Sequence, residues 1–314
     1  MTSSIRSPSL LWNATWRSVL YLVTFLLATL ALALPVGLGY FAFRALQGDE
    51  LEEITLHLED VLLYLHTLLA LGQLLAALAL TAIWMRWLDR RGRLAELGMR
   101  WPGRSPLLAF LLGVGMAALT TGLAAAASKL VVTGWAWQSE SLVDVLLVDL
   151  GGLAPLFLFM VLADELIFRG YIRWAFTGTA RTGNIAPIAS AVLYGLYRIV
   201  AWRMLGDTGA QATGTLAMVC LGGVVAGLAL ARAWRAGKSL WTPIGLHLGW
   251  AWASGLVFSM PVGGKTAEGL LLVRTTDGLL AGGAAGPEAG LIGILVWLAA
   301  WGLLYVIEQR NPGQ

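Results

Sequence analysis

The sequence predicts an all-α, polytopic membrane protein with about eight transmembrane helices, and two properties of the chain predict this class. Of the 314 residues, 58% are hydrophobic and only 12% are charged, about half the charged fraction of a typical soluble domain. The mean hydropathy is +0.75, and the apolar residues gather in runs of the roughly 20 residues that cross a bilayer. A single cysteine, Cys220, excludes an internal disulfide and a thiol-based metal cluster.

Eight apolar runs follow one another along the chain. The first is too long for the core of a cleaved signal peptide, which has about 7–15 residues, so it should remain as a span. The fifth is the least regular, because Pro187 lies near its start and Arg198 interrupts it. In the sixth, Gly223 and Gly227 have the spacing that lets a neighbouring helix approach closely, which favours packing inside the bundle over dimerisation. The expected spans are Ser18–Phe43, Val61–Met85, Leu107–Val132, Val143–Phe168, Ile185–Trp202, Thr213–Trp234, Leu240–Val262 and Ala289–Ile307.

Basic residues concentrate in alternate loops. The segment before the first span and the loops after the second, fourth and sixth spans are rich in arginine, whereas the loop after the first span is acidic. Positive residues mark the cytoplasmic side of membrane proteins, so both termini should be cytoplasmic. The net charge of +3 is then explained by topology rather than by nucleic-acid binding.

The stretch Ala163–Tyr171 carries the charges that cost most free energy to bury in a membrane. It places two adjacent carboxylates and an arginine at the end of the fourth apolar run. Glu165 and Arg169 are four residues apart, so on a helix they share a face and can form an ion pair. Asp164 points about 100° away and therefore needs another partner or a proton. Charges at such depth usually mark a functional site, here toward the cytoplasmic end of the span.

Two further ionisable residues lie within later spans: Arg198, four residues after Tyr194, and His247. Buried ionisable groups in membrane proteins generally face the bundle interior and one another. Asp164, Glu165, Arg169, Arg198 and His247 should therefore share one interior site, although His247 could also be a structural imidazole bonded to a neighbouring helix.

No cofactor is indicated by these residues. His247 is the only histidine within reach of the carboxylates, whereas catalytic zinc commonly has three protein ligands with several nitrogens or sulfurs. Weak binding of a divalent metal stays open, although the nearby arginines oppose it. A serine nucleophile on a sharp strand-to-helix turn is not indicated either.

The motifs Asp164-Glu165-xxx-Arg169, Tyr194-Gly-Leu-Tyr-Arg198 and His247-Leu-Gly-Trp-Ala251 occur in this order on the fourth, fifth and seventh runs. They resemble the EExxxR, FxxxH and HxxxN motifs of the CAAX-protease and bacteriocin-processing (CPBP) family of intramembrane endopeptidases. The resemblance extends over Val143 to Leu298, including the glycine-rich Gly282–Gly290. It implies two regions: residues 1–142 with helices one to three, and a CPBP-like domain at 143–314 with helices four to eight.

In that family the first glutamate and the first histidine are thought to activate water, while the second histidine and the asparagine polarise the scissile carbonyl or hold its oxyanion. By this resemblance Asp164 stands for the base, Arg198 for the first histidine, His247 for the second and Ala251 for the asparagine. Glu165, Arg169 and His247 match the family pattern.

Each of the three departures weakens hydrolysis. Aspartate shortens the base by one methylene, and a displacement of about 1 Å can cost roughly 10²-fold in rate. Arginine cannot accept a proton in the accessible pH range. Alanine removes an oxyanion donor, a loss on the order of 10²–10³-fold. We expect Arg198 to pair with Asp164, so that two acids and two arginines form a neutral network.

The resemblance thus implies an intramembrane CAAX-type endopeptidase acting on membrane-associated polypeptides. The substitutions favour an inactive relative that binds or scaffolds membrane partners. A transporter-like ion or proton site is a third alternative, although no inverted repeat of interrupted helices supports it. Expected partners are membrane lipid and a membrane-associated polypeptide, without nucleic acid, and the expected location is the bacterial inner membrane.

Overall fold

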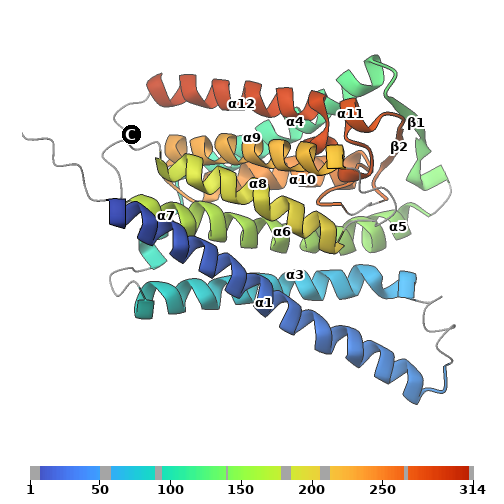
Figure 1. Ribbon diagram of the computed structural model, residues 1–314. Coiled ribbons are helices and arrows are strands. Elements are labelled where there is room, and N and C mark those ends of the chain that lie inside the picture. Colours follow the sequence, from blue (N-terminus) through green and yellow to red (C-terminus); the bar gives the residue numbers. More distant parts are fainter. Residues whose placement is uncertain are drawn as a thin grey trace, which may run out of the picture.

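The computed structural model describes residues 8–49, 58–88, 94–138, 141–177, 185–205, 213–264 and 268–310. Long helices run roughly along one direction and form a bundle (Figure 1). The apolar sequence explains this architecture, because a helix satisfies all of its backbone polar groups internally and needs no water to do so. The principal helices are α1 (Pro8–Leu46), α3 (Leu58–Ile83), α4 (Ser105–Ala126), α6 (Gly151–Glu165), α8 (Ile185–Leu205), α9 (Thr213–Gly237), α10 (Trp241–Trp252) and α12 (Leu291–Arg310).

Among the described residues, seven helical segments are long and apolar enough to cross a membrane. The protein is therefore an integral, polytopic membrane protein, as the sequence predicts. Seven of the eight expected spans correspond to these segments, which are Leu11–Leu46, Tyr64–Leu88, Ser105–Ala126, Leu142–Thr177, Ile185–Arg203, Gly214–Gly237 and Leu291–Arg310.

The seventh expected span, Leu240–Val262, is shorter in the structure. Its helix α10 has 12 residues and continues into a five-residue π-helical turn, η7 (Ala253–Val257). The continuous segment Trp241–Val257 lies at the lower end of the range of about 17–25 residues that crosses a bilayer. Helix α10 packs against α4, α6 and α9, so it is an internal helix of the bundle.

Helices α4 and α10 touch backbone to backbone. A Cβ added to Gly245 or Gly249 of α10 would overlap a carbonyl oxygen of α4, and one added to Gly113 of α4 would overlap the carbonyl oxygen of Leu246. Gly245 and Gly249 each lie two residues from His247, on the opposite face of α10. This close contact therefore sets the rotation of α10 and directs His247 away from α4.

The spacing of Gly223 and Gly227 serves packing within the bundle, as expected. A Cβ added to Gly223 would lie 2.9 Å from the Cα of Gly195, and one added to Gly227 would lie 2.8 Å from the Cα of Ala191. Both contacts join α9 to α8.

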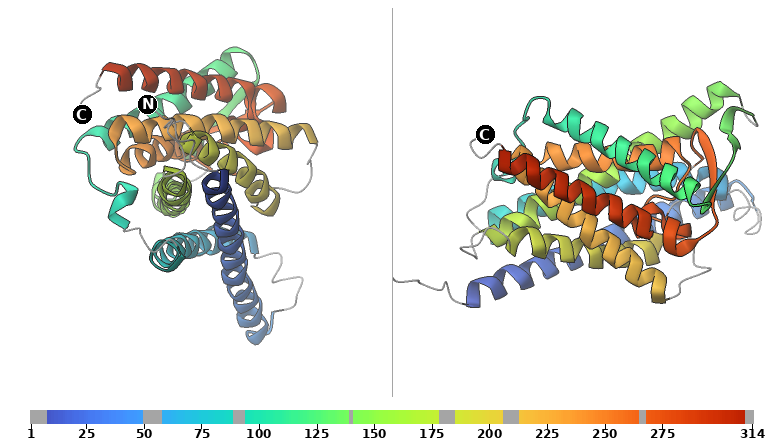
Figure 2. Two further views of the ribbon diagram at one scale, coloured as in Figure 1. Left: turned by 60° about the vertical axis from the view of Figure 1, so that its left-hand side comes forward. Right: turned by 90° about the horizontal axis from the view of Figure 1, so that it is seen from above.

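Helices α1 and α3 lie on one side of the remaining bundle (Figures 1 and 2). They pack on each other, and α3 also packs on α6. Tyr21 of α1 joins this side to the core, because its hydroxyl lies 2.8 Å from Oγ1 of Thr81 and its ring stacks on Tyr171.

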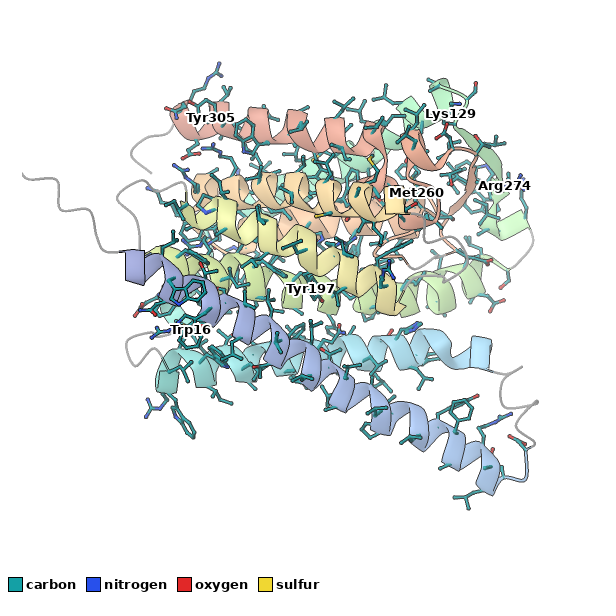
Figure 3. All side chains as sticks on the ribbon, in the orientation of Figure 1. Trp16, Lys129, Tyr197, Met260, Arg274 and Tyr305 are labelled. Carbon is teal, nitrogen blue, oxygen red and sulfur yellow. The ribbon has the colours of Figure 1, made fainter. Side chains whose placement is uncertain are left out.

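A small amount of β-structure caps one end of the bundle. Strands β1 (Leu130–Trp135) and β2 (Leu271–Thr275) form a two-stranded antiparallel sheet, which the sequence did not predict. Lys129 and Arg274 lie at this end, whereas Trp16 and Tyr305 lie at the opposite end (Figure 3). Helix α1 begins and α12 ends at that opposite end (Figure 1).

Shorter elements connect the helices and shape the site. They are η1 (Trp84–Leu88), η2 (Leu94–Leu97), η3 (Ala136–Gln138), α5 (Leu142–Asp144), η4 (Val145–Leu150), η5 (Leu166–Ile172), α7 (Arg173–Thr177), α11 (Gly278–Ala281), η8 (Gly283–Ala285) and η9 (Pro287–Ala289).

Candidate functional site

The buried charges gather where α6, α8 and α10 meet. Asp164 and Glu165 are the last two residues of α6, and Arg169 lies in the π-helical turn η5 that follows directly. Such wider turns within helices are frequent at functional sites. Glu165 and Arg169 are completely buried, and His247 of α10 is 4% exposed.

One carboxylate oxygen of Glu165 contacts both Arg169 and His247. Its Oε1 lies 3.3 Å from Nη1 of Arg169, which confirms the predicted pair. The same Oε1 lies 2.8 Å from Nδ1 of His247. Because a carboxylate oxygen accepts, Nδ1 carries the hydrogen of this bond. The imidazole is therefore oriented by Glu165.

Tyr194 of α8 completes this inner group. The Cζ atom of Arg169 lies 4.4 Å from the centre of the Tyr194 ring, a cation–π arrangement. The ring also meets the His247 imidazole edge-on, with centroids 6.2 Å apart. Tyr194 thus contacts both partners of Glu165 from a third helix.

Arg198 forms a different ion pair from the expected one. Its Nη2 lies 2.7 Å from Oε2 of Glu288, and the expected pair with Asp164 is wrong. Glu288 also accepts a hydrogen bond from Nε1 of Trp250 at 3.0 Å. The physical reason is that the turn η9 brings a carboxylate into the bundle, and this carboxylate captures the guanidinium.

Asp164 has no hydrogen bond and no ion pair within the described part of the chain, although it is only 8% exposed. We expected Asp164 to have a separate partner, but Arg198 is not that partner because it pairs with Glu288. An unpaired carboxyl inside a bundle is costly unless water, a proton or a ligand compensates for it. Asp164 is the member of the group that stays available to a further molecule.

Ala251, one turn beyond His247 on α10, is 1% exposed and belongs to the hydrophobic core. Its methyl group supplies no hydrogen-bond donor. The place at which the resemblance puts an oxyanion donor is apolar in this protein.

Several polar atoms of the inner group are buried without a partner in the described structure. They are Oε2 of Glu165 and Nε and Nη2 of Arg169. Unsatisfied polar atoms of this kind are rare in proteins and commonly mark a site for water or a ligand. Within the described ranges, no group of three or more His, Cys, Asp and Glu side chains has the arrangement of a metal site.

Two cavities border the site. A small one, lined among others by Arg198, Gly263 and Glu288, has room for about one water molecule. An apolar groove of about 180 Å³ lies between α3, α6 and α10 and includes Leu166 and Ile244, next to Glu165 and three residues before His247. Its lining residues are apolar, and none of the charged residues of the site is among them.

Glu288 and Trp250 are site residues that the sequence did not assign. Glu288 lies 90 residues after Arg198 and appeared only as part of a glycine-rich stretch. The available signal was an acidic residue in an otherwise apolar segment directly before the last helix.

Comparison with known proteins gives one family match. Residues 146–253 match the family described as Type II CAAX prenyl endopeptidase Rce1-like. This range contains all seven site residues expected from the sequence and ends before Glu288. The extension of the resemblance to Leu298 and the division at residue 142 stay predictions. Neither curated proteins nor solved structures give a match.

Proposed function

Since residues 146–253 are an Rce1-like, CPBP-type segment of an integral membrane protein, we propose that this protein binds membrane-associated polypeptides at its buried charge cluster without hydrolysing them. Its role is like that of a CAAX protease in the class of polypeptide that it binds, and it differs in the loss of hydrolysis. The bacterial inner membrane and cytoplasmic termini belong to the same proposal.

One observation carries it: Arg198 stands where the family has a proton-accepting histidine, and Nη2 of this arginine is held by Glu288 at 2.7 Å. A guanidinium does not give up its proton in the accessible pH range, so it cannot help to activate water. Its pairing with Glu288 makes it part of a structural ion pair.

The other groups needed for hydrolysis are also altered or occupied. Oε1 of Glu165 is engaged by His247 and Arg169, so this carboxylate acts as an orienting group. Ala251 provides no oxyanion donor, a loss on the order of 10²–10³-fold in rate. Binding needs none of these catalytic groups, and the apolar groove beside Leu166 and Ile244 offers a place for the apolar part of a polypeptide.

A second function, slow hydrolysis, is favoured by one specific observation. Asp164 has no ion pair or hydrogen bond among the described residues, so its carboxyl is free to accept a proton from water. His247, oriented by Glu165, could then polarise a carbonyl.

Activity measurements separate the two functions. The purified protein in liposomes, incubated with a library of lipid-modified and unmodified peptides, should release no cleavage products detectable by mass spectrometry. The smallest change able to create cleavage should be Asp164→Glu, Arg198→His and Ala251→Asn combined with Glu288→Gln, because Arg198→His alone would strand Glu288. Turnover by the unmodified protein, lost in Asp164→Ala, would establish the hydrolytic function instead.

Binding is tested with the same peptides. A photoreactive amino acid at Ile244, in the groove, should cross-link to them, whereas the same amino acid at the exposed Leu119 of α4 should not. Equal cross-linking at the two positions, or none at Ile244, would contradict polypeptide binding in this groove.

A further inference from the structure

The buried charges include a second ion pair, Arg198 with Glu288, beside the group of Glu165, Arg169 and His247. Glu288 lies outside the matched family segment. Glu288 belongs to the short turn η9, directly before α12, and is 7% exposed. The backbone of this turn lies directly on two helices. A Cβ added to Gly222 of α9 would overlap the carbonyl oxygen of Glu288, and one added to Gly293 of α12 would overlap that of Pro287. The position of the Glu288 backbone is therefore closely determined.

Each oxygen of the Glu288 carboxylate has a partner on a different helix. Oε2 binds Nη2 of Arg198 on α8, and Oε1 accepts the Nε1 hydrogen of Trp250 on α10. With its backbone held by the turn and its two oxygens held from two sides, this carboxylate has little freedom to rotate. It offers Arg198 a fixed, charge-assisted bond of 2.7 Å.

Two glycines lie against the Arg198 side chain. A Cβ added to Gly223 would lie 3.1 Å from its Cγ, and one added to Gly263 would lie 3.6 Å from its Nη1, so larger residues at these positions would crowd the arginine. Asp164 is close enough for electrostatic interaction with Arg198 but makes no ion pair with it. Of the two acids, Glu288 is the one that holds the guanidinium.

We infer that Glu288 is a positioning residue that draws Arg198 away from Asp164 and thereby keeps the Asp164 carboxyl unpaired for a bound molecule. Trp250 supports this role by orienting Glu288. Without the negative charge of Glu288, Arg198 turns to Asp164, the remaining acid within electrostatic range, and closes the site. The role deepens the proposed function and rests on it, but the pairing of the charges is measured in the protein without any polypeptide bound, so the two are tested separately.

Carbodiimide labelling measures whether Asp164 is paired. Dicyclohexylcarbodiimide enters membranes and modifies carboxyl groups that carry a proton, whereas a carboxylate held by a guanidinium resists it. In the full-length protein in liposomes, peptide mapping by mass spectrometry should find the adduct on Asp164 and little on Glu288. Loss of this adduct in Asp164→Asn confirms that Asp164 is the labelled residue.

The charge-removing variant gives the decisive comparison. In Glu288→Gln, labelling of Asp164 should fall by about tenfold or more, because an adjacent guanidinium stabilises the ionised carboxylate. In Glu288→Gln/Arg198→Met, labelling should return to the original level. Glu308→Gln is the matched control, since Glu308 forms an equally short pair with Arg232 elsewhere in the bundle and should not affect Asp164.

The inference is overturned if Glu288→Gln leaves Asp164 labelling unchanged, or if the double variant stays protected. A third measurement remains valid even if Glu288→Gln fails to fold. In Arg198→Met, Glu288 should become labelled while Asp164 stays labelled. An unmodified protein in which Glu288 reacts and Asp164 does not would also exclude the inferred role.

Discussion

Nδ1 of His247 lies 2.8 Å from Oε1 of Glu165, the same oxygen that Arg169 contacts at 3.3 Å. One carboxylate oxygen thus links a histidine from α10 to an arginine from η5 in the completely buried part of the bundle. Removal of Arg169 or His247 leaves this buried carboxylate with one partner fewer, so this oxygen couples the stability of the fold to the orientation of the site.

The arginine of this group should be essential for stability. Arg169→Ala leaves a buried carboxylate with one partner fewer and should cost about 3–5 kcal/mol in the free energy of unfolding. The double variant Glu165→Gln/Arg169→Met should recover part of the loss, because the charge is removed and the glutamine can still bond to His247. Reversible unfolding in mixed micelles measures both. An Arg169→Ala protein as stable as the parent would show that the pair contributes little.

Two glycines of α4 provide a matched test of how α10 is positioned. Gly113→Ala should destabilise the protein by about 1–3 kcal/mol, because its methyl group would overlap the backbone of α10 at Leu246. Gly115→Ala should be neutral or stabilise by up to about 1 kcal/mol, since nothing lies within 4 Å and alanine is the better helix former. Thermal unfolding in detergent compares them, and similar effects would contradict backbone contact between α4 and α10.

The basic loops predict the orientation of the protein in the membrane. A reporter that is active only in the cytoplasm should be active when fused after Arg93 or after Gln314, and inactive when fused near Glu53. These three positions lie outside the described residues, so the expectation rests on the arginine distribution alone. The opposite reporter pattern would place the charge cluster toward the other side of the membrane.

Asp277, at the sheet-capped end, should make a small pH-dependent contribution to stability. Hydrogen bonds from the backbone N–H of Leu280 and then from Lys129 and Leu279 lower the pKa of this exposed carboxyl below its usual value, against a smaller opposing effect of burial. A carboxyl with a lowered pKa in the folded state stabilises the protein above its unfolded pKa and loses this effect as the pH falls through the folded pKa.

The matched variant is Asp277→Asn, because asparagine also caps helix N-termini but carries no charge. The parent should unfold at a higher temperature than Asp277→Asn at pH 7, and the difference should decrease progressively as the pH falls below about 4, the usual pKa of aspartate. A difference that keeps its pH 7 size down to about pH 2 would exclude ionisation of Asp277 as its cause.

Local patterns predicted much of this protein correctly. The all-α membrane class follows from the apolar runs, because a helix satisfies its backbone polar groups internally and can therefore cross a bilayer. The pair of Glu165 and Arg169 follows from a spacing of four residues, which a helix, and here also the turn η5, converts into a contact. The packing of Gly223 and Gly227 against α8 likewise follows from spacing within one helix.

Hydropathy did not predict the place of α10. This helix lies inside the bundle, where glycines on the facing sides of α10 and α4 let the two helices approach. Hydropathy does not distinguish a helix buried among other helices from one that faces lipid, because both environments are apolar.

The sequence by itself therefore determined the membrane class, the helix order and the ionisable residues of the fourth, fifth and seventh runs that lie inside the bundle. Only the tertiary structure decided how these charges pair. Glu165 meets His247 across 82 residues of chain, and Glu288 meets Arg198 across 90. Electrostatic attraction favours every acid–arginine combination, so the choice depends on which backbones approach one another. The glycine contacts that seat the turn η9 on α9 and α12 bring Glu288 to Arg198 and leave Asp164 unpaired.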